Sequence, residues 1–299
     1  MQWKGRRQSS NIEDRRGGGA VKTGGISIGG IVIALILWKV FGVDPATTLG
    51  VQQQMQTQST QTAPTNETAN QTESREFVAT VLADTEDVWT PIFQTLGRTY
   101  QAPTLVLFSG RVQSACGAAT SASGPFYCPA DQKVYLDTNF FADMRRQMGI
   151  TGEKNQSQLS RSDQAGDFAQ AYVIAHEVGH HVQTVLGISS QVRQAQAGAK
   201  SKAAANELSV RQELQADCFA GLWANKNHAR TQFLQQGDIE EALDAAEKIG
   251  DDYLQQKAQG HTVPDSFTHG TSEQRKRWFY KGLETGDIQQ CDTFAARQL

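Results

Sequence analysis

The sequence of 299 residues lacks several features that would place it in a common class of protein. Its net charge is only −3, so no excess of one sign predicts nucleic acid or an anionic membrane surface as the main partner. The four cysteines, at positions 116, 128, 218 and 291, form no CxxC pair, which argues against a zinc finger and against a thioredoxin-like redox site. No internal repeat is present. The length suffices for one substantial core with appended segments.

Long apolar runs are also scarce, and the one that stands out lies near the N-terminus. Residues 24–43, GGISIGGIVIALILWKVFGV, have about the length that a helix needs to cross a bilayer, and Lys39 near one end can snorkel to the interface. Basic residues precede this run and none occurs at 40–74, so the positive-inside rule predicts a cytoplasmic tail over residues 1–23. A cleaved signal peptide, with its apolar region at 26–38, is the alternative. Because no small-x-small cleavage site follows, we expect a retained transmembrane helix with the rest of the chain outside the cytoplasm.

The remainder divides into a polar stretch and a globular part. Residues 44–75 are rich in Gln, Thr, Asn and Ser and have too little apolar surface to offset the entropy of ordering, which predicts a flexible linker. Residues 76–299 form the expected domain, with apolar residues at helical spacing near its start and short strands at 104–110 and 133–138. Helical patterns then dominate, at 167–186, 203–226, 238–257 and 272–283. Strands followed by a run of helices predict an α+β fold that is mainly helical with a small β-sheet.

The motif HEVGH, at 176–180, carries the most specific chemistry. Residues four apart lie on one face of a helix, so His176 and His180 would present their rings to one ion, and zinc suits imidazole. Glu177 would lie beside the ion, where it can take a proton from a zinc-activated water and return it to the leaving amine. The alternative is a pair of buried structural histidines, but a charged residue between them disfavours it. The adjacent His181 is expected to face away from the ion.

A third ligand is expected from the second apolar helix. Glu213 and Asp217, again four residues apart, are surrounded by apolar side chains, so Glu213 can complete a His-His-Glu site. Asp217 is placed to orient a ligand histidine by accepting its other ring proton. A solvated acidic face is the alternative for this pair. Glu207 is the second choice of ligand, and Cys218 is a minor one.

At this point the chain resembles a known family. HEVGHH, the downstream ELQADCFAG and the upstream SACGAATSASGPFYCPADQKVYLDTNFF are similar to the bacterial neutral zinc metallopeptidases of the YpfJ type, over nearly the whole chain. The HExxH…ExxxD arrangement is also similar to the HtpX and CAAX-prenyl-protease group of glutamate-type zincins. The resemblance implies a zincin-like metallopeptidase domain, with His176, His180 and Glu213 as ligands of Zn²⁺ and Glu177 as catalytic base.

Two further stretches are interpreted through this resemblance. In the HtpX-like group a His-Pro followed by an Arg comes after the third ligand, whereas here His269 precedes Gly270, with Arg275 and Arg277 downstream. If the correspondence holds, His269 or one of these arginines stabilises the oxyanion; otherwise the stretch is a loop before a short amphipathic helix. The strand KVYLDTNFF is expected at the sheet edge beside the cleft, where it would pair with substrate, or else in the sheet core.

The cysteines are compatible with two disulfides in an oxidising compartment. Cys116 and Cys128 flank a loop that a disulfide could close, and a Cys218–Cys291 pair would attach the C-terminal tail to the ligand helix. Four cysteines allow three connectivities, and free buried thiols remain the other alternative.

These observations predict a zinc metallopeptidase, an endopeptidase, anchored in the bacterial inner membrane with its catalytic domain in the periplasm or outside the cell. Its partners would be a peptide or protein substrate in the cell envelope and the membrane itself, without nucleic acid. The alternatives are a catalytically silent zincin-fold scaffold protein and a zinc hydrolase acting on a non-peptide amide. An intact Glu177 with a full ligand set favours the enzyme.

Overall fold

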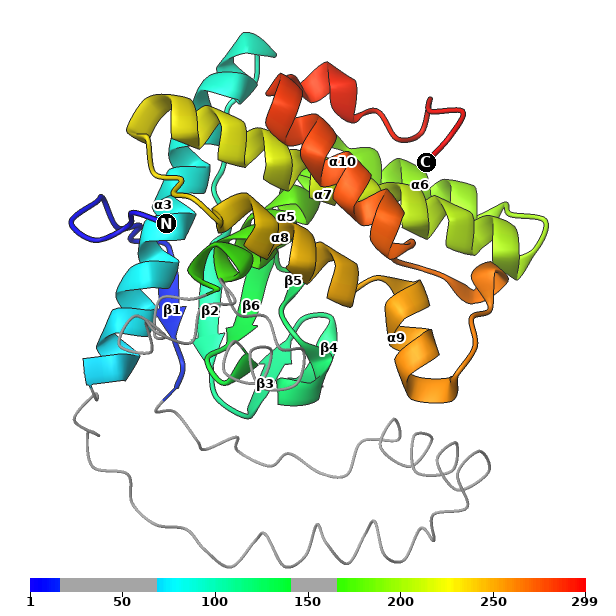
Figure 1. The fold of residues 1–299 in the computed structure, drawn as a ribbon, viewed down its shortest axis with the longest axis horizontal. Helices are drawn as coiled ribbons and strands as arrows, with labels where there is room; N and C mark the ends of the chain where they lie inside the picture. Colours follow the sequence, from blue (N-terminus) through cyan, green and yellow to red (C-terminus); the bar gives the residue numbers. More distant parts are fainter. Residues whose placement is uncertain (17–68, 141–165) are drawn as a thin grey trace, which may run out of the picture. The chain divides into compact units, whose positions relative to one another are not determined.

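The computed structural model describes residues 1–16, 69–140 and 166–299 (Figure 1). A four-stranded sheet has the order β1-β2-β6-β5, made by β1 (Ile12–Asp14), β2 (Thr104–Phe108), β6 (Lys133–Asp137) and β5 (Phe126–Cys128). The first three strands are parallel, and β5 joins the outside of β6 in the antiparallel direction. A separate hairpin consists of β3 (Arg111–Ser114) and β4 (Gly117–Thr120). The strands expected at 104–110 and 133–138 are therefore present as β2 and β6.

Helices make up most of the described chain. They are α3 (Ala69–Thr95), α5 (Asp167–Leu186), α6 (Ile188–Ala197), α7 (Lys202–Thr231), α8 (Asp238–Lys248), α9 (Asp251–Gln259) and α10 (Ser272–Thr285). Short 3-10 turns occur at Ser121–Ser123, Pro264–Ser266 and Ile288–Cys291. The helix predicted over 238–257 is two helices, α8 and α9, because the chain turns at Gly250. At this position a Cβ would overlap Ser272, the first residue of α10.

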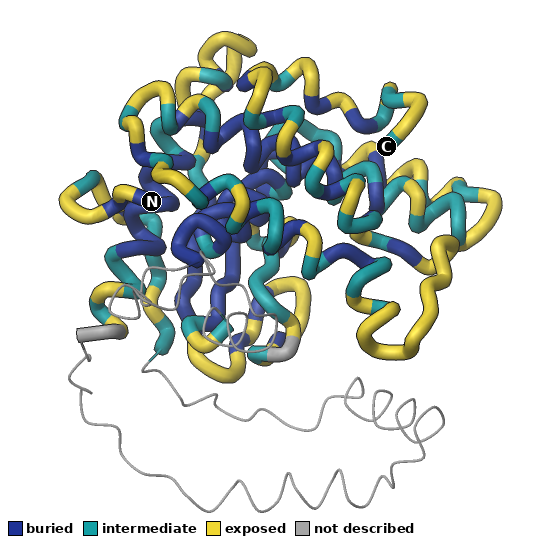
Figure 2. Tube along the Cα trace, viewed as in Figure 1, coloured by how far each residue is buried: buried dark blue, intermediate teal, exposed yellow. Residues whose placement is uncertain are grey.

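Helix α5 lies at the centre of the packing. It contacts β5 and β6 of the sheet as well as α3, α7 and α8 (Figure 1). Buried segments accordingly concentrate on the strands and on the helices around α5, whereas α9 and the outer loops are more exposed (Figure 2). On the far side of α7, helix α10 approaches through Gly221 and Gly282, since a Cβ at either glycine would overlap the backbone of the opposing helix. A mainly helical domain with a small sheet is thus what the sequence predicted.

Residues 1–15 are part of this domain, although the sequence predicted a separate cytoplasmic tail that begins at residue 1. Met1–Arg15 and Thr68–Leu299 form one compact unit, and β1 pairs in parallel with β2. The Met1 ammonium donates hydrogen bonds to Asp167 at 2.8 Å and to Asp238 at 3.2 Å. A membrane cannot separate two segments of one compact unit. The predicted single-pass arrangement, with the N-terminus cytoplasmic and the domain outside, is therefore wrong.

The predicted fold also included a transmembrane helix, and this part needs correction. Within residues 1–16, 69–140 and 166–299, no helix combines the length and the apolar character needed to cross a bilayer. The longest ones, α3 and α7, carry several charged side chains each. The span expected at 24–43 lies outside the described residues, as does the predicted linker up to Ala69, where α3 begins.

Both expected disulfides are present. Cys116 pairs with Cys128 and closes the segment that contains β4 and leads into β5. Cys218 pairs with Cys291 and joins α7 to the C-terminal segment. No free cysteine remains. A zinc-ligand role for Cys218 is therefore excluded, since its sulfur is in a disulfide.

Candidate metal centre

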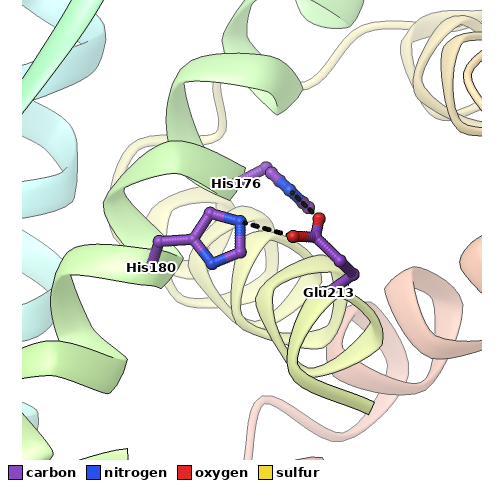
Figure 3. A group of neighbouring side chains, drawn as sticks. All are labelled: His176, His180 and Glu213. Atoms are coloured by element: carbon purple, nitrogen blue, oxygen red, sulfur yellow. Dashed lines mark hydrogen bonds and ion pairs between the residues drawn. The ribbon is translucent and has the colours of Figure 1, made fainter. Parts of the chain in front are cut away.

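Two helices bring the predicted ligands together. His176 and His180 lie one turn apart on α5, and Glu213 reaches them from α7 with its carboxylate between the two imidazoles (Figure 3). The distance from His176 Nε2 to Glu213 Oε2 is 3.2 Å, and that from His180 Nε2 to Glu213 Oε1 is 3.4 Å. All three side chains are largely shielded from solvent. The sequence-predicted set is thus assembled at one point.

The crossing of α5 and α7 explains this convergence. A Cβ at Gly179 would lie 3.1 Å from both the Cα and the carbonyl oxygen of Ala216, so the absence of a side chain lets the two backbones approach closely. Gly179 immediately precedes His180, and Ala216 lies three residues after Glu213. Close contact at this crossing brings the ligand faces of both helices toward each other. An ordinary side chain at position 179 would separate them.

Asp217 organises the back of the site. Its Oδ1 accepts a hydrogen bond from His176 Nδ1 at 2.7 Å and one from the Tyr172 hydroxyl at 2.6 Å. Arg275 completes the group with two hydrogen bonds, from Nε to Oδ2 at 3.0 Å and from Nη2 to Oδ1 at 2.9 Å. Because a carboxylate only accepts, His176 carries a proton on Nδ1, and Nε2 is the ring nitrogen that faces Glu213. The orienting role predicted for Asp217 matches this geometry, whereas Tyr172 was not predicted.

The donor set fits a zinc ion. The ligand atoms of His176, His180 and Glu213 all lie within 4.8 Å of one another, and two imidazoles with one carboxylate are a known ligand set for catalytic zinc. Burial lowers the pKa of His176, but the charge and hydrogen bond of Asp217 outweigh it and raise this pKa to about 10. The pKa of Glu213 is well below its ordinary value, because the neighbouring imidazoles outweigh the effect of its burial. The negative charge of Glu213 and Asp217 that favours protons on these imidazoles would also favour a divalent cation, which would displace those protons on binding.

Glu177 lies next to this group without belonging to it. Its side chain lines the same cleft as His176 and His180, and the residue is only 9% exposed. Burial raises the pKa of Glu177 above its ordinary value, while the two imidazoles and a hydrogen bond with the Tyr127 backbone act in the opposite direction. A carboxylate in this environment can both accept and return a proton.

The remaining candidates on these helices are turned away or engaged elsewhere. His181 is buried with its Nε2 at 2.6 Å from the Gln101 carbonyl oxygen and its Nδ1 at 3.2 Å from the Tyr127 hydroxyl, as expected for a structural histidine. The side chain of Glu207 is 59% exposed and pairs with Arg211, so it is not a ligand.

His269 and the two arginines take three different positions. His269 lines the cleft, and its Nδ1 lies 3.1 Å from Asp251 Oδ1; this hydrogen bond raises the pKa of His269. Asp251 also accepts the backbone N–H groups of residues 268–270, which fixes the loop that carries His269. Arg275 also lines the cleft, but its guanidinium is hydrogen-bonded to Asp217. Arg277 pairs with Glu273 on the exposed side of α10.

The cleft has a volume of about 410 Å³, within the usual range for ligand sites. Its lining includes residues 123–127, which lead into and include β5, as well as Ile249, Leu254 and His269. The strand at the sheet edge is therefore β5, not β6 as the sequence suggested. Strand β6 lies between β2 and β5, because the chain between Cys116 and Cys128 returns to add β5 on its outer side.

A second cluster of carboxylates lies at the start of α5 and α8. Asp167, Asp238 and Glu241 are close enough to hold a cation. The Met1 ammonium already pairs with Asp167 and Asp238, so this cluster has a cationic partner within the chain. We assign it no metal.

Comparison with known proteins places these residues in a family. A family model with the description "Putative neutral zinc metallopeptidase" matches residues 1–294. The chain is 47% identical over 98% of its length to the Escherichia coli K12 protein named "Uncharacterized protein YpfJ", of which it covers 99%. It is 41% identical over 71% of its length to "Uncharacterized protein Mb2605" of Mycobacterium bovis, of which it covers 68%. No solved structure matches the chain.

Proposed function

The chain belongs to the family described as "Putative neutral zinc metallopeptidase". We propose that it is a zinc-dependent endopeptidase, which cleaves internal peptide bonds of peptide or protein substrates. The observation that carries the proposal is the convergence of His176, His180 and Glu213 in one cleft, with Glu177 beside them. These three side chains would hold the zinc ion. Zinc bound there would polarise the carbonyl of the scissile bond and stabilise negative charge on its oxygen.

The protein's own groups would perform the remaining steps. A carboxylate oxygen of Glu177 would take a proton from the attacking water and pass it to the leaving nitrogen of the peptide. Asp217 would keep His176 in the tautomer that leaves Nε2 free as a ligand. The outer edge of β5, which pairs with no further strand among the described residues, would pair with an extended substrate backbone and hold the scissile bond over the metal ligands.

We expect removal of the metal to abolish peptide cleavage. The full-length protein would be treated with a strong zinc chelator, dialysed, and assayed on a diverse peptide library before and after zinc is added back. Zinc should restore cleavage, whereas magnesium should not, because Mg²⁺ prefers oxygen ligands and octahedral geometry. Cleavage that survives complete zinc removal would contradict the proposal. Stoichiometric zinc without cleavage of any peptide would instead favour a binding protein.

His269 is proposed to stabilise the oxyanion. Its hydrogen bond to Asp251 holds the ring in the cleft and favours the protonated form, which can donate from Nε2. We expect His269→Ala to lower kcat by about 10²-fold with little change in zinc content, as for loss of one oxyanion donor. His261→Ala is the control, because His261 is exposed and does not line the cleft. An unchanged kcat in His269→Ala would leave His269 a loop residue only.

A further inference from the structure

The two histidines of the site are oriented by different partners. His176 Nδ1 meets the carboxylate of Asp217, but His180 Nδ1 lies 2.9 Å from Oε1 of Gln183, a neutral amide one turn along α5. Gln183 is fully buried. Its amide nitrogen donates to the Gln212 carbonyl oxygen at 2.7 Å and to Gln215 Oε1 at 3.1 Å. Gln212 immediately precedes Glu213, so one side chain contacts a ligand histidine and the backbone beside the ligand glutamate.

Backbone carbonyls set the direction of the hydrogen bonds that the Gln183 and Gln215 amides form. The Gln212 carbonyl can only accept, so the NH₂ end of Gln183 faces α7 and its oxygen faces His180. His180 must then carry a proton on Nδ1, so Nε2, which faces Glu213, is the nitrogen left to bind a metal. Gln215 is fixed in the same way, because its NH₂ group donates to the Cys291 carbonyl oxygen at 3.0 Å.

The backbone carbonyl that accepts from Gln215 belongs to a residue that is held by a covalent bond. Cys291 forms the disulfide with Cys218 of α7, so the carbonyl that orients Gln215 has a fixed position. The next residues are also attached to α7, since the Thr293 hydroxyl donates to the Arg211 carbonyl oxygen at 2.6 Å. The C-terminal segment therefore serves as a support for the metal site without contacting it.

We propose that Gln183 and Gln215 form a positioning relay that fixes His180 as an Nε2 ligand, with the Cys218–Cys291 disulfide anchoring its far end. This inference rests on the proposed zinc site and adds residues to it. The relay orients His180 without adding charge, while Asp217 orients His176 with a carboxylate that Arg275 neutralises. Only Glu213 then contributes an unneutralised negative charge to the predicted ligand set.

The test compares Gln183→Met with the wild type in the full-length protein. Methionine has nearly the same shape but no amide, so the hydrogen bond to His180 is lost while the core remains filled. We expect zinc to bind about 10- to 100-fold more weakly, the usual effect of losing a group that orients a metal ligand. The control is Gln196→Met, because Gln196 also donates to a carbonyl of α7 but forms no hydrogen bond with a histidine of the described residues. It should leave zinc affinity unchanged.

Two further readouts separate orientation of His180 from general stability. In the NMR spectrum of the cobalt-substituted wild type, we expect two slowly exchanging imidazole N–H signals, from His176 and His180. In Gln183→Met only the signal of His176 should persist.

Gln183→Glu keeps an acceptor for His180, so it should bind zinc more tightly than Gln183→Met. It should nevertheless unfold at lower denaturant concentration than the wild type, because its carboxylate faces the Gln212 carbonyl.

The outcomes distinguish the relay from the zinc site itself. Equal zinc affinity in wild type and Gln183→Met, with both N–H signals retained, would overturn the relay and leave the zinc site intact. Zinc binding by Gln183→Glu as weak as that of Gln183→Met would overturn it as well. Failure of the wild type to bind zinc would overturn the proposed function. If Gln183→Met does not fold, Gln215→Met breaks the next link, and unchanged zinc affinity in that variant would overturn the relay.

Discussion

Replacing Glu177 by glutamine is expected to lower kcat for peptide cleavage by about 10²- to 10⁴-fold, the range for loss of a general acid–base group. Glutamine keeps the size of the side chain but cannot take a proton from water at neutral pH. Because Glu177 lines the cleft beside the three ligand atoms and is not one of them, zinc content should stay at the wild-type level. Steady-state kinetics and metal analysis on the same preparation measure both quantities.

The matched control for this prediction is Glu207→Gln. Glu207 lies on α7, like the proposed ligand Glu213, but it is exposed, pairs with Arg211 and does not line the cleft. Its replacement should change neither kcat nor zinc content. Wild-type cleavage by Glu177→Gln would remove Glu177 from the mechanism, and loss of zinc in that variant would make it a ligand instead.

The second large effect is expected on stability. Asp217→Ala should lower the free energy of unfolding by about 3–5 kcal/mol, because it leaves the Arg275 guanidinium buried without its partner. Both side chains are almost completely inaccessible, at 0% exposed for Asp217 and 3% for Arg275. The Tyr172 hydroxyl and His176 Nδ1 lose their acceptor at the same time. Urea unfolding of both proteins without metal isolates this effect from zinc binding.

A second substitution tests the cause of that loss. Adding Arg275→Met to Asp217→Ala removes the uncompensated charge, so the double variant should be more stable than Asp217→Ala alone. For comparison, Glu207→Ala breaks the largely exposed pair with Arg211 and should change stability by less than about 1 kcal/mol. If Asp217→Ala unfolds at the wild-type urea concentration, the buried group does not stabilise the fold as inferred.

The grouping of the three proposed ligands could be predicted because its information is local. The spacing of His176 and His180 needs only helical geometry, and α5 has the predicted bounds because apolar residues surround the motif over its whole length. Glu213 and Asp217 could be found for the same reason, as polar residues four apart in an apolar helix. The missing side chain at Gly179 lets α7 pack closely against α5 at Ala216.

What could not be predicted depends on contacts between distant segments. Strand β1 comes from residues that look like a charged tail, and it joins the sheet only because β2, far along the chain, provides an open edge. The outer position of β5 follows from the return of the chain after Cys116. The roles of Gln183 and Gln215 are set by backbone carbonyls at Gln212 and Cys291, and a carbonyl has no sequence signal.

The most direct test of the zinc site is anomalous diffraction at the zinc absorption edge from crystals of the zinc-loaded full-length protein. We predict one zinc per chain, at about 2.0–2.2 Å from His176 Nε2, His180 Nε2 and a carboxylate oxygen of Glu213. An anomalous peak bound by other residues, or no peak between α5 and α7 in crystals that contain zinc, would contradict the site and the peptidase function built on it.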